Sequence, residues 1–242
     1  MRLEKYLIEA VPELIDNIPR AREAIERDCK TYIREVGDPF DGNNVLYRGA
    51  KGWDGISLWR VKGRGKPRLP KDTPKILHRI SNIAFKKKFG WPVRDGVFTT
   101  SDSYMASDYG RVGVFYPIGN YKYAWSPEVD DFYEDVIQNM GIATYRKLDD
   151  FEDLYLTVLK RLDQRSYQGE SLRDFLEKKL GPDFLQKTEL VTPKVVREWI
   201  DYEIGEAIKT YTNKGLAKAI YSKQEVSFNV KEYYLAPEWI YE

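Results

Sequence analysis

The chain has 242 residues, 42% of them hydrophobic, and a formal net charge of +1, which supplies enough apolar material for one large core and argues against intrinsic disorder. Its one cysteine, Cys29, and its one histidine, His78, exclude an internal disulfide, a thiolate metal cluster and a histidine-rich zinc site. No uncharged apolar run approaches about 20 residues and the N-terminal pattern contains acids, so we expect no membrane span, no secretory signal and a cytoplasmic protein.

The N-terminal segment repeats apolar side chains at helical spacing. Leu3 and Leu7 begin a pattern with steps of three and four residues, and it resumes after Pro19. We therefore predict helices over residues 1–36, with Cys29 on their buried face.

Residues 43–125 are expected to form the first part of a β core. VLYRG at 45–49 is typical of a short strand closed by glycine, and a polar, basic loop of about twenty residues should follow it. Thr73-Pro74 predicts the start of a helix that Gly90 ends.

Two further β segments complete this part. GVFTTS at 96–101 predicts a strand, after which Asp102 or Ser103 can cap a short helix that ends at Gly110. VGVFYPIGNYKYAW at 112–125 is rich in aromatic and β-branched residues, which favours strands.

The character changes to helical at Ser126-Pro127, where acids follow in the first turn and favour the positive end of a helix dipole. We predict a helical insertion over 126–220 that folds against the β core. EVSFNV then returns to a strand pattern, so residues 221–242 should complete the core of one domain, 1–242. The predicted helices lie near 127–140, 148–163, 171–180 and 193–220.

Charge is segregated along the chain. Residues 60–94 contain twelve Lys and Arg against one acid, and residues 128–153 contain nine acids against two basic residues. Two solvated or mutually complementary faces would explain this pattern. The alternative is a basic surface that contacts the phosphates of a nucleic acid.

Carboxylates at helical spacing offer a metal-site alternative. Asp130, Asp131, Glu134 and Asp135 would share a helix face, and DDFED at 149–153 would supply further ligands for Mg²⁺ or Mn²⁺. Exposed helices often carry such runs and no metal-loop glycine accompanies them, so we expect no metal. His78, the one histidine, lies between Leu77 and Ile80 on a predicted helix and is assigned a structural role, so catalysis in this chain would use carboxylates, hydroxyls and arginine.

Three stretches in chain order carry a further pattern: LYRG at 46–49, GVFTTS followed by YMASDYG at 96–110, and KQEVSF at 223–228. Together they resemble the arginine-serine-glutamate class of ADP-ribosyltransferases, toxin-like enzymes that bacteriophages also carry. The resemblance implies an α+β fold with a split β-sheet core, NAD as the substrate, no metal, and the host cytoplasm as the location if a phage encodes the chain.

The resemblance assigns a role to each matching position. Arg48 takes the place of the family's arginine, Gly49 that of a backbone contact to nicotinamide, and Glu225 that of the catalytic glutamate. The catalytic candidates are Arg48, Thr99 and Glu225, and the NAD-binding candidates are Arg48, Gly49, Thr99, Thr100, Ser101 and Tyr109. Core packing is the alternative for Tyr109, as for Tyr121 and Tyr123.

This set of residue types suits the chemistry of NAD. An arginine at a strand end can bind the pyrophosphate through two parallel hydrogen bonds. A carboxylate beside the ribose stabilises the oxocarbenium-like state in which the glycosidic bond breaks. Hydroxyls orient that carboxylate without adding charge.

Structural alternatives exist for each candidate. Arg48 can pair with a local acid such as Asp54, the hydroxyl run can be an edge strand that enters a helix cap, and Glu225 can be an exposed residue at a strand start. Gln168-Gly169-Glu170 matches the family's Gln-x-Glu literally, but a helical pattern follows it, so we prefer Glu225. Lys223 stands where the family has Glu or Gln, which leaves the acceptor undefined.

The resemblance thus implies a mono-ADP-ribosyltransferase that modifies a host protein or nucleic acid. A non-catalytic protein that binds nucleic acid through residues 60–94, or is associated with the virion, is the alternative. We further expect residues 60–75 to form a mobile basic loop beside the NAD site.

Overall fold

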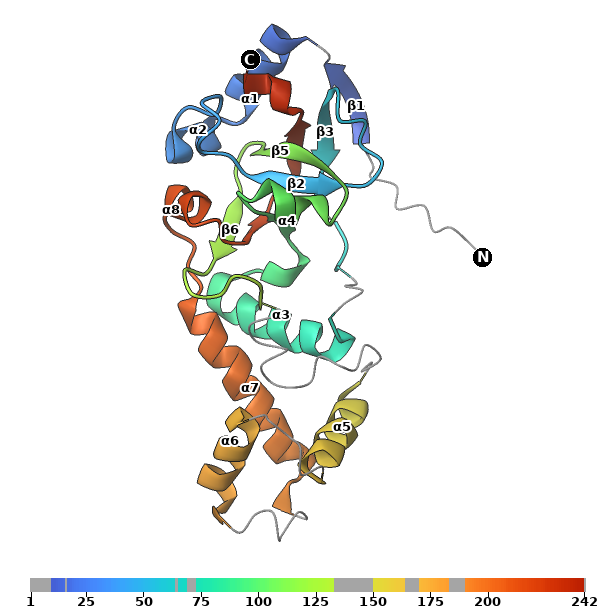
Figure 1. Ribbon diagram of the computed structural model, residues 1–242, viewed down its shortest axis with the longest axis vertical. Coiled ribbons are helices and arrows are strands. Elements are labelled where there is room, and N and C mark those ends of the chain that lie inside the picture. Colours follow the sequence, from blue (N-terminus) through green and yellow to red (C-terminus); the bar gives the residue numbers. More distant parts are fainter. Residues whose placement is uncertain are drawn as a thin grey trace, which may run out of the picture. The chain divides into compact units, whose positions relative to one another are not determined.

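The computed structural model places the described residues in two compact units, which we call the core unit and the helical unit (Figure 1). The core unit comprises Met1–Arg68, Asp95–Pro127 and Thr212–Glu242, and the helical unit comprises Leu69–Arg94 and Glu128–Tyr211. The structure describes residues 10–15, 17–63, 65–68, 73–132, 150–163, 170–182 and 190–241.

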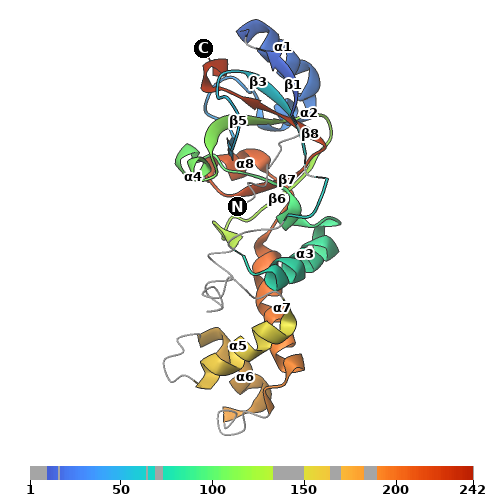
Figure 2. The ribbon, with the colours of Figure 1, turned by 90° about the vertical axis from the view of Figure 1, so that its right-hand side faces the viewer.

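The core unit contains two antiparallel sheets (Figures 1 and 2). One has the strand order β1-β3-β8-β5-β2 and the other the order β4-β7-β6. The strands are β1 (Ala10–Ile15), β2 (Tyr47–Ala50), β3 (Leu58–Lys62), β4 (Val97–Thr99), β5 (Arg111–Pro117), β6 (Lys122–Trp125), β7 (Val226–Asn229) and β8 (Glu232–Ala236). An isolated bridge between Tyr47 and Thr100 joins the two sheets.

Short helices complete the core unit. They are α1 (Ile18–Asp28), α2 (Lys30–Val36), α4 (Ser103–Ser107), α8 (Leu216–Tyr221) and a 3-10 helix at Glu238–Tyr241. Asn17 caps α1 and Asp102 caps α4 through their side chains, which satisfies backbone N–H groups that a helix start leaves without partners. The expected cap at Asp102 is therefore confirmed.

The apolar core of this unit lies between its sheets and helices. Phe115 of β5 packs against Phe228 of β7 with ring centroids 5.0 Å apart, so side chains of the two sheets meet directly. Cys29 is buried, as expected, in the same cluster as Tyr32. Burial raises the pKa of the Cys29 thiol, which keeps it protonated at neutral pH.

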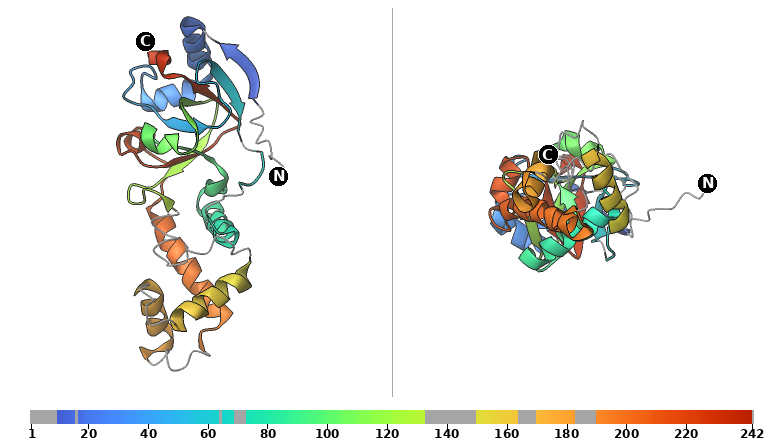
Figure 3. Two further views of the ribbon diagram at one scale, coloured as in Figure 1. Left: turned by 45° about the vertical axis from the view of Figure 1, so that its right-hand side comes forward. Right: turned by 90° about the horizontal axis from the view of Figure 1, so that it is seen from below.

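The helical unit is built on α7 (Pro193–Thr210), and it also contains α3 (Lys75–Phe89), α5 (Phe151–Asp163) and α6 (Glu170–Leu180) (Figure 3). Thr192 caps α7 and Pro193 occupies its first turn, where proline loses no hydrogen bond. Trp199 and Ile204 are fully buried on its inner face. Lys88 of α3 donates from Nζ to the carbonyls of Ile208, Lys209 and Tyr211 at the C-terminal end of α7.

The expectation of helices throughout 1–36 is wrong for part of the segment, because Ala10–Ile15 form strand β1. β1 pairs with β3 at the edge of its sheet, with a register shift between Val11 and Ile15. Pro12 explains the difference, since proline disrupts a helix interior but is tolerated on an edge strand.

The basic loop expected after β2 is also interrupted by a strand. Residues 58–62 form β3, which pairs with both β1 and β8, and its Leu58 and Val61 are buried. Residues 60–62 therefore do not belong to a mobile loop. Partners from distant parts of the chain provide the hydrogen bonds that a basic local sequence does not predict.

The division into units differs from the expected insertion in two places. Helix α3, which we assigned to the β core, belongs to the helical unit, and α8, which we assigned to the insertion, belongs to the core unit. The single-domain assignment remains a prediction. In the described part of the chain, no helix combines the length and apolar character needed to cross a bilayer.

Candidate functional site

Arg48 lies on β2 at the junction of the two sheets. Its Nη1 donates to the carbonyl of Phe98 on β4 at 2.8 Å, and its guanidinium carbon lies 5.8 Å from the ring centre of Tyr233 on β8. Arg48 is half-buried, and its buried Nε makes no hydrogen bond to the described residues. A buried guanidinium donor without a partner is uncommon, because leaving it unsatisfied costs free energy.

The bridge between the sheets places the hydroxyl run next to Arg48. The backbone N–H of Tyr47 donates to the carbonyl of Thr100 at 2.6 Å, and that of Thr100 donates back at 3.1 Å. On its other side, β4 pairs with β7, with Thr99 opposite Val226. The segments that carry Arg48, the hydroxyls and Glu225 are therefore neighbours in space.

All three hydroxyls donate to main-chain carbonyls close to Glu225 in the sequence. Thr99 donates to the carbonyl of Val226 at 3.1 Å, and Thr100 donates to that of Lys223 at 3.3 Å. Ser101 donates to the carbonyl of Ile220 at 2.5 Å. Thr99 and Thr100 are only 3% and 9% exposed, so these hydroxyls hold the connection between α8 and β7 from inside the fold. We expected them to orient the Glu225 carboxylate directly, whereas these bonds fix its main chain.

That connection has an unusual backbone. Lys223 has a φ of 60°, and no other non-glycine residue in the described ranges has a positive φ. Such a conformation costs free energy and persists only where surrounding contacts impose it. Glu225 follows two residues later, half-buried and directly before β7, as expected. Between them, Gln224 has a buried Oε1 with no hydrogen-bond partner in the described structure.

Gly49 and Tyr109 are brought together by helix α4, which lies against β2 (Figure 1). A Cβ on Gly49 would lie 2.1 Å from the carbonyl oxygen of Ala106 and 2.9 Å from the Cβ of Tyr109. Close packing of α4 on the strand therefore requires glycine here. Tyr109 is 57% exposed, so it is not a core residue.

Tyr121 and Tyr123 have a structural role instead. Their hydroxyls donate to the two carboxylate oxygens of Glu35 on α2, at 2.7 and 2.6 Å. Burial contributes most to raising the pKa of both tyrosines, and the adjacent Glu35 carboxylate raises it further, so both hydroxyls stay protonated and act as donors. These two rings tie α2 to the second sheet.

Arg68 is a neighbour of the site, and the sequence reasoning included it only as a cation of the basic loop 60–75 expected beside the NAD site. Its guanidinium carbon lies 4.6 Å from the ring centre of Phe98, the residue whose carbonyl binds Arg48. The backbone N–H of Arg68 donates to Asp95 at 3.0 Å. In the sequence, Arg68 was one of many cations in a basic run, and nothing local indicated its aromatic partner.

Asp54, the alternative partner for Arg48, is engaged in its own turn. Its Oδ1 accepts the backbone N–H groups of Ile56 and Ser57 at 2.9 and 3.0 Å. Burial acts to raise the pKa of Asp54, but these hydrogen bonds outweigh it and lower the pKa. Asp54 thus stabilises the turn before β3.

The rival glutamate, Glu170, is the first residue of helix α6 in the helical unit. It begins a helix and not a strand, in agreement with the periodicity of the residues after it. The literal Gln-x-Glu match therefore stands in a different structural context from Glu225.

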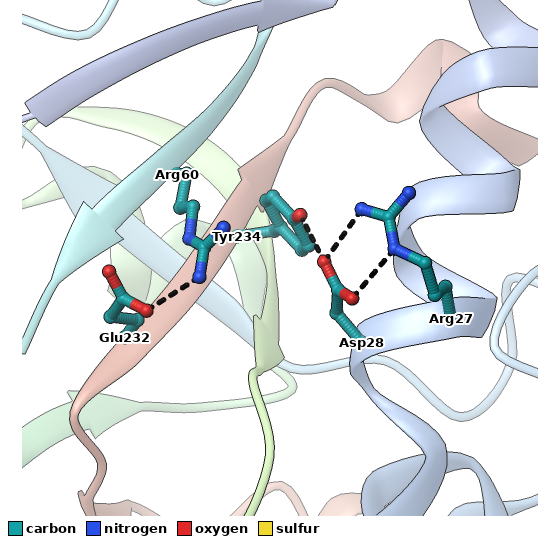
Figure 4. Close-up of polar contacts among 5 residues, drawn as sticks. All are labelled: Arg27, Asp28, Arg60, Glu232 and Tyr234. Atoms are coloured by element: carbon teal, nitrogen blue, oxygen red, sulfur yellow. Dashed lines mark hydrogen bonds and ion pairs between the residues drawn. The ribbon is translucent and has the colours of Figure 1, made fainter.

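A polar network supports the strand that carries Tyr233 (Figure 4). Arg60 of β3 binds Glu232 of β8 at 2.7 Å, and the hydroxyl of Tyr234 donates to Asp28 at 2.7 Å. The hydrogen bond from Arg27, together with that from Tyr234, holds the pKa of Asp28 below its ordinary value despite partial burial. The network connects α1, β3 and β8.

No group of three His, Cys, Asp or Glu side chains suited to a metal ion occurs in the described ranges. Glu134 and Asp135 of the carboxylate alternative lie outside those ranges. The chain matches no model of a known protein family, no curated protein and no solved structure.

Proposed function

We propose that the chain is a mono-ADP-ribosyltransferase that transfers ADP-ribose from NAD to a protein or nucleic acid. The observation that carries the proposal is the adjacency of β2, β4 and β7. It brings Arg48, the hydroxyls of residues 99–101 and Glu225 together from three distant parts of the chain.

The sheet arrangement supports the split β core that the resemblance implies. One sheet contains β4-β7-β6 and the other contains β2 next to β5 and β8, and the junction between them is the Tyr47–Thr100 bridge. The arginine strand lies on one side of this junction, and the hydroxyl and glutamate strands lie on the other.

Arg48 fits the pyrophosphate of NAD. Its guanidinium uses Nη1 to bind Phe98, and its buried Nε has no partner in the described structure, so the fold does not satisfy all the donors of this cation. The ring of Tyr233 beside the guanidinium restricts its orientation. Arg48 would thus hold the dinucleotide by one charged, partly preorganised group.

Glu225 would act at the ribose. The bond between the nicotinamide nitrogen and the ribose C1 breaks, and its electron pair leaves with nicotinamide, which becomes neutral. The Glu225 carboxylate stabilises the positive charge that develops on the ribose. The acceptor nucleophile then bonds to C1 and releases its proton to solvent or to a nearby base.

The three hydroxyls would maintain this geometry indirectly. Because they bind the carbonyls of Ile220, Lys223 and Val226, they fix the main chain on both sides of Glu225. A carboxylate held in advance loses less free energy to reorganisation when charge develops in the transition state.

The test compares matched glutamate variants in a transfer assay with labelled NAD and a cell lysate, whose protein and nucleic-acid fractions are counted separately. We expect Glu225→Gln to lower the transfer rate about 100- to 1000-fold. NAD should still raise its melting temperature, because Arg48 supplies ground-state binding. Glu170→Gln should keep full activity.

Arg48→Lys separates binding from chemistry. It retains the positive charge but loses the planar fork that binds two oxygens, so the NAD-dependent stabilisation should weaken before the rate at saturating NAD does. The proposal fails if NAD does not stabilise the wild-type chain. Full activity in Glu225→Gln with loss in Glu170→Gln would move the catalytic glutamate to the helical unit.

A further inference from the structure

The structure divides the basic run 60–94 between the two units and gives several of its members structural partners. The unit boundary falls between Arg68 and Leu69. In the core unit, Arg60 forms an ion pair with Glu232, and the guanidinium of Arg68 lies over the ring of Phe98. In the helical unit, Lys88 donates to carbonyls at the end of α7, and the buried Arg94 lies over the ring of Phe132. These four cations are therefore explained by the fold, and the run does not form one uniform basic surface.

Four further cations of the run are exposed on one face of α3 in the helical unit. Lys75, Arg79, Lys86 and Lys87 are exposed, and together with Ile83 they cover about 120° of the helix circumference at 3.6 residues per turn. The helix sequence contains no Asp or Glu. Buried Leu77, Ile80 and Phe85 occupy the remaining circumference and anchor the helix in its unit.

We propose that this face of α3 binds the sugar-phosphate backbone of a double-stranded nucleic acid, without regard to sequence. The four cations extend over about 18 Å, at 1.5 Å per residue from Lys75 to Lys87. Duplex DNA presents one negative charge per about 1.7 Å of its axis, so phosphates are available along the whole length of this face. Release of the condensed counterions drives such binding.

Features of α3 favour a duplex over a single strand. Proteins that bind single strands stack the bases on exposed aromatic rings. The two aromatic residues of α3 do not serve this purpose, because Phe85 is fully buried and Phe89 packs against it with ring centroids 6.3 Å apart. A face of cations without an exposed ring contacts phosphates and not bases.

The same face does not suit a lipid surface or a protein groove. A helix that lies in a membrane interface inserts its apolar side, and the apolar side of α3 is buried in the helical unit. Ile83, 64% exposed, is the one large apolar side chain exposed on α3, too little for a protein hot spot. The inference does not rest on the proposed transferase activity, since it requires neither NAD nor Glu225.

The experiment measures binding of the full chain to a fluorescent 20-base-pair duplex, without NAD, between 50 and 200 mM salt. The test variant is Arg79→Gln/Lys86→Gln/Lys87→Gln. Its matched control, Lys30→Gln/Lys122→Gln/Lys231→Gln, removes three exposed cations from the core unit and changes the net charge equally. Thermal unfolding verifies that both variants are folded.

Removal of three phosphate contacts should reduce the slope of log K against log salt by about 2.7, at about 0.9 for each contact. We expect the α3 variant to bind at least tenfold more weakly and the control to change by less than twofold. The inference is overturned if the wild-type chain does not bind the duplex at 50 mM salt, or if the control loses as much affinity as the α3 variant. Tighter binding of a single strand of equal length, or equal competition by polyglutamate, would also overturn it.

Discussion

Thr99 on β4 donates its hydroxyl to the main-chain carbonyl of Val226 on β7, the residue directly after Glu225, at 3.1 Å. A buried side chain of one strand thereby sets the position of the candidate catalytic segment on the next. Thr100 and Ser101 repeat this relationship with the carbonyls of Lys223, on the connection before β7, and of Ile220, near the end of α8. Three consecutive hydroxyls thus act as fixed supports for a strained turn.

Thr99→Val tests this support, because valine keeps the shape of threonine and removes only the donor. The free energy of unfolding should fall by about 1 kcal/mol, the usual net value of one hydrogen bond. Under the proposed function, the transfer rate should fall more than NAD binding does. Thr210→Val in α7 removes a comparable hydroxyl-to-carbonyl bond and should leave the transfer rate unchanged. Equal effects of both variants on the rate would contradict the supporting role.

Gly49→Ala should destabilise the core unit. The added Cβ would overlap the carbonyl oxygen of Ala106, which is main chain and cannot rotate away. We expect a loss of about 1–3 kcal/mol, the usual range for overpacking, measured by urea unfolding. Gly205→Ala is the matched control, since a Cβ there meets nothing within 4 Å and alanine favours a helix interior by about 1 kcal/mol. An unchanged stability of Gly49→Ala would show that α4 is not closely packed on β2.

Asp28→Asn should alter the pH dependence of stability. Arg27 and Tyr234 lower the pKa of Asp28 in the folded state, so its ionised form contributes stability above about pH 4 and loses it as the pH falls through the folded-state pKa. Asparagine retains an oxygen acceptor but no charge. The variant should be less stable than the wild type by about 1 kcal/mol at pH 7 and equally stable near pH 2.

Urea unfolding at both pH values measures the effect of Asp28→Asn. The exposed Asp201 of α7 provides the control, and Asp201→Asn should change stability little at either pH. A deficit in Asp28→Asn that is the same at pH 2 and pH 7 would show that the charge of Asp28 does not contribute.

Lys88→Met should weaken the helical unit. Lys88 donates to three carbonyls at the C-terminal end of α7, where a cation also interacts favourably with the helix dipole. Methionine keeps the apolar stem and removes these bonds, so we expect a loss of about 1 kcal/mol in thermal or urea unfolding. Lys87→Met, on the adjacent exposed position, should be nearly neutral. If Lys88→Met and Lys87→Met have the same effect, the hydrogen bonds from Lys88 do not stabilise the C-terminal end of α7.

The local sequence predicted those helices and strands whose residue pattern and boundary residues lie within or next to the element itself. Segments rich in aromatic and β-branched residues predicted β5 and β6, and GVFTTS predicted β4. Helical periodicity with proline and glycine boundaries predicted α3, α5, α6 and α7. Asp102 capped α4 as expected, because a cap acts on the N–H groups two or three residues away. The segment 127–140 lies mostly outside the described residues.

Tertiary structure decided the elements whose hydrogen bonds come from elsewhere. β1 forms the edge of its sheet by pairing with β3, and β3 lies inside the sheet between β1 and β8. The helical spacing around β1 and the basic composition around β3 did not indicate these distant partners. Contacts across the fold also explain two further features. Gly49 is required because α4 packs closely on it, and the guanidinium of Arg68 lies over the ring of Phe98.

The candidate site shows the same division. The sequence by itself determined which residue types were available, namely one arginine at the end of a short strand, three hydroxyls on a second strand and a glutamate before a third. Only the tertiary structure decided that β2, β4 and β7 are neighbours, and that the hydroxyls bind the main chain around Glu225. The physical reason is that antiparallel pairing and buried hydrogen bonds join segments about 50 and 125 residues apart, and no local pattern encodes such a register.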